Sequence, residues 1–136
     1  MVVMEIEESF DYTQEIAVYN DGEKVTYACD DKEFGKIMAS WKELISNGHQ
    51  MPAFGVSLNS ATVMAMKTGV WVEFVFDGVR KCNEMPFEKL LINVNPAFQG
   101  FNIIRYNSGF GYDGRCFYVD LVGKDMSSFY NVLMDI

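Results

Sequence analysis

The segment EIAVYNDGEKVTYA, residues 15–28, alternates apolar and polar residues on either side of an Asp-Gly pair. Asp21 and Gly22 suit the positive φ angles of a type I′ turn, whose twist matches that of two paired strands. A turn at this pair sets Val18 opposite Val25 on one face. The same register gives three further pairs: Ile16 with Tyr27, Ala17 with Thr26 and Tyr19 with Lys24. The segment therefore predicts an antiparallel hairpin with one buried face.

A second Asp-Gly pair, Asp77-Gly78, follows the most apolar segment of the chain, GVWVEFVF, residues 69–76. Both alternating sets of this segment are apolar except for Glu73, which predicts a central strand covered on both faces. We expect a hairpin at Asp77-Gly78 and then a short edge strand that Pro86 ends. The segment that follows, residues 87–95, alternates like a further strand.

Helical periodicity marks three other segments. Residues 30–48 carry apolar side chains at helical spacing and begin with acidic residues that can cap the first turn. Gly35 lies inside this helix, where glycine is unfavourable, and predicts close packing against a neighbouring backbone. Residues 124–136 form a second amphipathic pattern, and residues 59–69 predict a short helix, with a strand as the alternative.

The order of these elements predicts an α+β fold, with a mostly antiparallel sheet built from Asp-Gly hairpins and helices packed on it. Two main amphipathic helices and one short helix are expected. A chain of 136 residues suits a single domain spanning residues 1–136. Within it, residues 1–12 are candidates for a flexible acidic arm.

The third Asp-Gly pair lies in GFGYDG, residues 109–114, which also matches the G-x-G-x-x-G spacing of nucleotide-binding loops. A dinucleotide site needs a helix after the glycines, whereas the residues after Gly114 alternate like a strand. We therefore interpret the stretch as a hairpin with its turn at Asp113-Gly114. That register lays Tyr118 over Gly109 and, on the same face, sets Arg105 diagonal to Asp120.

Composition excludes several classes of protein and site. No apolar run is long enough for a membrane span, and the first residues do not resemble a signal peptide, so we expect a cytoplasmic protein. Three widely spaced cysteines predict neither a disulfide framework nor a metal site. A single histidine, His49, excludes histidine dyads, and no nucleophile motif occurs. We expect no cofactor and no metal, and we expect that the protein is not an enzyme.

Charge is concentrated in the first third of the chain. Residues 1–48 contain eleven acidic residues and four lysines, a net of −7, whereas residues 49–136 contain eight acidic and seven basic residues, a net of −1. Such a surface repels nucleic acid and anionic membranes and attracts basic proteins. We expect a non-enzymatic interaction domain whose acidic third docks a basic protein partner, or which associates with itself as a homodimer. The residues proposed for docking are Glu5, Glu7, Glu8, Asp11 and Trp71.

An alternative function is the binding of a small molecule, or a minor enzymatic activity. Under this hypothesis the pocket lies near Arg105, Asn107, Arg115 and Tyr118, where two guanidinium groups, an amide and an aromatic ring could hold a planar or anionic ligand.

Overall fold

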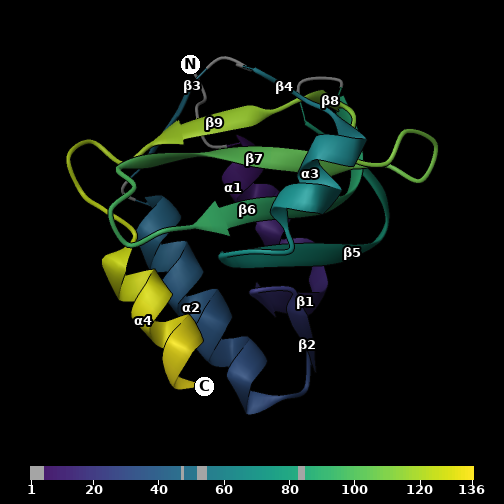
Figure 1. Cartoon of the computed structure of the whole chain (residues 1–136). Coiled ribbons are helices and arrows are strands. Elements are labelled where there is room, and N and C mark those ends of the chain that lie inside the picture. The colour runs from purple at the N-terminus through teal and green to yellow at the C-terminus, as the bar shows by residue number, and fades with distance from the viewer. Residues whose placement is uncertain (1–4, 47, 52–54, 83–84) are drawn as a thin grey trace.

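The computed structural model describes residues 5–46, 48–51, 55–82 and 85–136 (Figure 1). These residues form four α-helices, one 3₁₀-helix and nine strands, and every strand pair is antiparallel. The α+β class and the mostly antiparallel sheet are therefore confirmed. The helices are α1 (Glu5–Ser9), η1 (Phe10–Tyr12), α2 (Lys32–Ser46), α3 (Asn59–Ala65) and α4 (Ser127–Asp135).

Seven strands form one sheet in the order β2-β1-β5-β6-β7-β9-β3, so β2 and β3 lie at its two edges (Figure 1). Two short strands, β4 and β8, pair separately. The strands of the main sheet are β1 (Thr13–Asn20), β2 (Glu23–Ala28), β3 (His49–Met51), β5 (Val70–Cys82), β6 (Met85–Val94), β7 (Gly100–Tyr106) and β9 (Phe117–Asp120). The short pair consists of β4 (Val56–Ser57) and β8 (Gly114–Arg115).

The first hairpin has the register that its alternation predicts. Val18 pairs with Val25, and Asp21 and Gly22 adopt φ angles of 50° and 91°, as a type I′ turn requires. β1 also pairs with β5, which makes β5 a central strand of the sheet.

The hairpin predicted at Asp77-Gly78 is wrong, because β5 continues through this pair to Cys82. The pairing of β5 with β6 shifts between Val75 and Arg80, so the Asp-Gly pair lies in an irregular, bulged part of the strand. Pro86 does not end an edge strand but lies in β6 opposite Lys81. Gly and Asp mark bulges as well as turns, and local sequence does not separate the two.

The hairpin predicted at Asp113-Gly114 is also wrong in register. β7 pairs with β9 so that Asn102, not Gly109, lies opposite Tyr118. Asn107 and Gly111 close a small turn, after which Gly114 pairs with Ser57 in β4. The residues after Gly114 do form strands, as expected, but the connection is an irregular loop.

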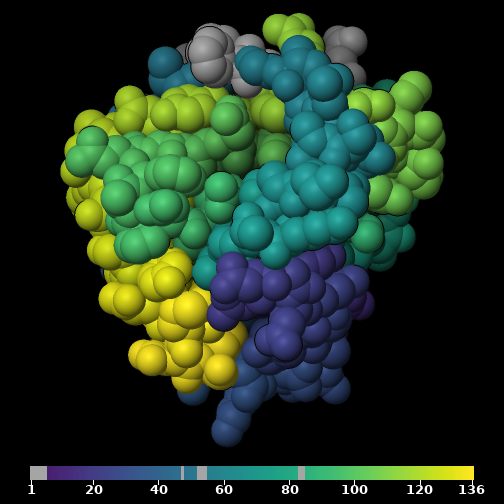
Figure 2. Space-filling view, in the orientation of Figure 1, coloured from purple at the N-terminus to yellow at the C-terminus, as the bar shows by residue number. Residues whose placement is uncertain are grey.

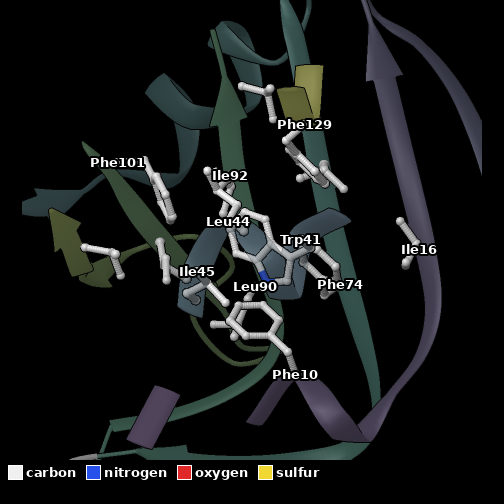
Figure 3. Packing of buried hydrophobic residues seen from close by; sticks show 14 of the residues in the cluster. Phe10, Ile16, Trp41, Leu44, Ile45, Phe74, Leu90, Ile92, Phe101 and Phe129 are labelled. Atoms are coloured by element: carbon white, nitrogen blue, oxygen red, sulfur yellow. The ribbon is translucent and has the colours of Figure 1, made fainter. Parts of the chain in front are cut away.

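α1, η1, α2 and α4 pack on one face of the sheet (Figure 1). The indole of Trp41 lies at the centre of this core, with ring centroids of Phe10, Phe74, Phe101 and Phe129 between 5.1 and 5.3 Å away (Figure 3). Aromatic contacts at such distances add to the free energy gained by burial. Ile6 and Phe10 belong to the same core and are fully buried, so the candidate arm is helical and packed over residues 5–12.

α3 covers part of the opposite face, where a smaller apolar cluster contains Met66, Trp71, Leu91 and Tyr112. The expectation of a central strand covered on both faces is therefore confirmed for β5. The expectation for Gly35 is wrong, because a Cβ at this exposed position would meet no atom within 4 Å. None of the helices in the described ranges combines the length and hydropathy of a membrane-spanning helix.

Candidate functional site

The predicted acidic docking residues lie on the N-terminal helices. Glu7 is partly buried in α1, Glu8 is exposed, and Asp11 in η1 is exposed and forms an ion pair with Lys42 of α2. Glu5 belongs to α1, but its side chain lies outside the described part of the structure.

A groove of about 620 Å³ runs beside Glu8 and Asp11. Its opposite wall is the bulged end of β5, which contributes Val79, Arg80 and Lys81. The Arg80 guanidinium lies 3.7 Å from the ring centroid of Tyr12, a cation–π contact across the groove. The groove therefore carries both signs of charge.

Trp71 is not brought together with these acids. Its side chain belongs to the cluster on the α3 face, is only 6% exposed, and donates its indole N–H to the carbonyl of Thr68 at 2.9 Å. The acidic helices pack on the other face of the sheet. Trp71 therefore does not share a surface with Glu8 and Asp11.

Other exposed carboxylates of the N-terminal third flank the edge strand β2. Asp21 lies in the turn before β2, Glu23 begins the strand, and Asp30 and Asp31 follow it. Two of them have backbone partners: the Asp21 carboxylate accepts from the amide of Gly69, and the Asp31 carboxylate accepts from that of Ala28, each at 2.8 Å. This edge of the sheet is the second place where acidic residues gather.

The most buried carboxylate, Glu73, lies at the centre of the sheet on the α3 face and is 1% exposed. Its Oε2 accepts a 2.6 Å hydrogen bond from the Tyr112 hydroxyl, and its Oε1 accepts a 3.3 Å bond from the Tyr19 hydroxyl. Burial and the neighbouring Glu73 charge raise the pKa of Tyr19 to about 12 and also raise the pKa of Tyr112. Both phenols therefore stay protonated at neutral pH and act as hydrogen-bond donors.

A hollow of about 310 Å³ opens next to this cluster, on the face that Figure 2 shows beside α3. Aromatic and amide side chains line it, among them Trp71, Asn93, Phe98, Asn102 and Tyr118. Gly100 forms part of its floor, and a Cβ at this position would lie only 2.9 Å from the Tyr118 ring and 3.0 Å from the Val119 carbonyl. Among the described residues, no charged side chain lines the hollow, so its chemistry suits a neutral ligand with apolar and polar faces.

The four residues predicted for a small-molecule site do not converge. Arg105 and Asn107 line a depression of about 330 Å³ together with the exposed Phe110, whereas Tyr118 lines the neutral hollow. Arg115 is exposed in β8, where it pairs with Val56.

The Arg105 guanidinium is hydrogen-bonded to two backbone carbonyls. It donates to the carbonyls of Pro86 and Arg115 at 2.7 and 2.8 Å, and its partial burial lowers its pKa. The predicted placement of Arg105 diagonal to Asp120 is wrong, because Asp120 pairs with Gly100 and its carboxylate accepts from the amide of Val122. Arg105 therefore fixes the irregular loop after β7.

Within the described part of the chain, the three cysteines and His49 do not gather into a catalytic or metal-binding cluster. Burial raises the pKa of the Cys116 thiol, which disfavours the reactive thiolate. Cys29 is exposed, Cys82 is buried, and His49 is exposed on the edge strand β3. In the described ranges, no group of three His, Cys, Asp or Glu side chains is arranged to hold a metal ion.

Comparison of the chain with protein-family models, with curated proteins and with solved structures finds no significant match to any of them.

Sequence reasoning identified Glu73 as the exception in an apolar strand but missed its two tyrosine partners. Tyr19 and Tyr112 lie 54 and 39 residues away, and only the sheet order and the loop after β7 bring them to Glu73. A lone acid inside a doubly apolar strand was the available signal, because a buried carboxylate needs donors.

Proposed function

We propose that this chain is a non-enzymatic cytoplasmic interaction domain that uses its acidic N-terminal third to bind a basic protein partner. The proposal rests on the distribution of charge: residues 1–48 carry a net of −7 out of −8. Exposed carboxylates from this third lie beside η1 and around β2. Their field would accelerate encounter with a basic surface.

The structure supports the proposal most directly through two exposed acids, one at each end of β2. Glu23 and Asp30 are exposed, and within the described residues neither forms an ion pair. Unpaired acids around one strand cost some stability through repulsion, and a basic partner would relieve this repulsion.

The proposal is tested by identifying proteins that co-purify from the native cell and reconstituting the complex from purified components. We expect the dissociation constant to rise steeply between low and moderate salt, because exposed charges are screened. The double variant Glu23→Gln and Asp30→Asn should weaken binding, whereas Asp125→Asn, remote in sequence from this third, should not. Affinity that responds to neither salt nor the double variant would contradict the proposal.

A second candidate function, the binding of a small molecule, is favoured by the neutral hollow beside Trp71 and Tyr118. Its volume of about 310 Å³ lies at the lower end of ligand pockets. A screen of neutral ring-containing compounds by ligand-observed NMR tests it, with Asn102→Ala as the variant that should lose binding.

A further inference from the structure

The edge strand β2 exposes backbone groups that can pair with another strand. In a hairpin with a two-residue turn, Asn20 and Glu23 exchange both of their backbone hydrogen bonds, and the pattern then alternates along the strands. The amides and carbonyls of Glu23, Val25 and Tyr27 therefore point to β1. Those of the intervening residues, Lys24, Thr26 and Ala28, point away from the sheet.

The contacts of Ala28 agree with this alternation. Its amide donates to the Asp31 carboxylate at 2.8 Å, and its carbonyl accepts from the Asp31 amide at 2.9 Å. The turn after β2 thus satisfies the last outward pair of groups. The amides and carbonyls of Lys24 and Thr26 remain, and in the described part of the chain no strand pairs with them.

The usual protections of an edge strand are weak here. β2 contains no proline, and its register with β1 is regular over all six residues. Lys24, the one lysine of β2, does not block pairing at this edge. Its ammonium lies 5.7 Å from the ring centroid of Tyr19, over the neighbouring strand β1.

A groove of about 200 Å³ borders the same edge on the α4 side, and apolar side chains of β2 and α4 line it together with the polar Asn20, Glu23 and Tyr27. Val25 is 51% exposed and Met134 is 37% exposed at this groove. A strand placed beside β2 would lay alternate side chains over these two residues, as in other cases of strand addition.

The charge around β2 indicates which kind of chain segment can bind there. Residues 20–33 contain five acidic residues and two lysines, a net of −3, with Asp21 and Glu23 at one end of the strand and Asp30 and Asp31 at the other. A second copy pairing antiparallel about Thr26 would bring the acids of one copy to the acids of the other, which is unfavourable. An extended segment with basic residues at both ends avoids this repulsion.

We propose that β2 binds an extended segment of a basic protein as an added strand, with an apolar side chain beside Val25 and lysine or arginine at each end. This inference rests on the proposed function and specifies its docking mode. Backbone pairing supplies affinity, and the flanking acids select the partner.

The test uses the full chain and a synthetic peptide of alternating valine and threonine between lysine pairs. A matched peptide carries N-methyl groups on alternate residues, which removes backbone donors but keeps the charge. We expect the first peptide to bind and the second to bind about tenfold or more weakly, since at least one hydrogen bond is lost. Amide exchange at Lys24 and Thr26 should slow when the first peptide is bound.

Variants of the chain separate the two proposals. Thr26→Pro removes an outward amide and should weaken binding of the first peptide, whereas Thr26→Val keeps the amide and should not. Equal binding of both peptides without protection of Thr26 would overturn strand addition and leave charge-driven docking in place. Failure of both peptides to bind at low salt would count against the proposed function as well. Sedimentation of the free chain as a dimer that Thr26→Pro dissociates would assign the edge to a second copy.

Discussion

The Tyr112 hydroxyl donates a 2.6 Å hydrogen bond to the Glu73 carboxylate, and this bond joins the irregular loop after β7 to the central strand of the sheet. Glu73 is 1% exposed, so its buried carboxylate needs hydrogen-bond donors from the protein. The same carboxylate also accepts from Tyr19 of the neighbouring strand β1. A single buried acid thereby ties the loop and two strands together.

Replacing Tyr112 by phenylalanine should destabilise the fold by about 1–3 kcal/mol, because a buried carboxylate loses its shorter hydrogen bond. Urea unfolding of Tyr112→Phe against the parent chain measures this change. Tyr106→Phe is the matched control, since the Tyr106 ring packs on Tyr112 with centroids 5.0 Å apart but donates no hydrogen bond to Glu73. Equal unfolding free energies for the two variants would contradict the role assigned to the bond.

Stability should fall as pH rises above about 10, the unperturbed pKa of tyrosine. The folded state raises the pKa of Tyr19 to about 12, so between these values the unfolded chain releases a proton that the folded chain retains. The unfolded state then binds fewer protons, and the free energy of unfolding decreases with pH. Tyr112, whose pKa is also raised, contributes in the same direction.

Urea unfolding at about pH 9 and about pH 11 tests this dependence. Tyr19→Phe should be less stable than the parent at the lower pH and should lose less stability between the two. A loss of the same size in both chains would assign the alkaline effect to other groups.

Periodicity predicted the elements whose partners are close in sequence. The β1–β2 hairpin has the predicted register because the type I′ turn and the alternation of Val18 and Val25 demand the same pairing. The helix α2 was also predicted, because the spacing of its apolar residues is a local feature of the sequence.

Sequence did not predict features that depend on distant partners. Asp77-Gly78 resembles a turn, yet β5 continues through it because β6 pairs on both sides of the bulge. Tyr118 was expected over Gly109 but lies against Gly100, since the loop from Asn107 to Gly114 takes up residues that a tight hairpin would have paired. The tyrosines around Glu73 were missed for the same reason.

Replacing Gly35 by alanine should stabilise the domain by about 1 kcal/mol, the difference between the two residues in a helix interior. Gly35 lies inside α2, is exposed, and leaves open space where a Cβ would be. Thermal unfolding measures the effect as a raised Tm. A lowered Tm would contradict this expectation and would indicate that Gly35 packs closely against a neighbouring backbone, as the sequence suggested.

The opposite result is expected at Gly100, where a Cβ would lie 2.9 Å from the Tyr118 ring and 3.0 Å from the Val119 carbonyl. The backbone oxygen cannot move without disturbing the pairing of β7 with β9, so the ring must shift. We expect Gly100→Ala to destabilise the domain by about 1–3 kcal/mol, as overpacking does. The displaced Tyr118 ring should also change the shape of the neutral hollow. The affinity of β2 for a basic peptide should not change.

Tyr118→Leu in the Gly100→Ala background decides whether the ring is the cause. If it is, the double variant should be more stable than the sum of the two single changes predicts, because leucine lacks the atoms that the new Cβ meets. Urea unfolding of all four chains gives this coupling energy. If the changes in unfolding free energy are additive, the strain lies at the Val119 carbonyl. The shape of the hollow would then be set by the backbone of β7 and β9 and not by the Tyr118 ring.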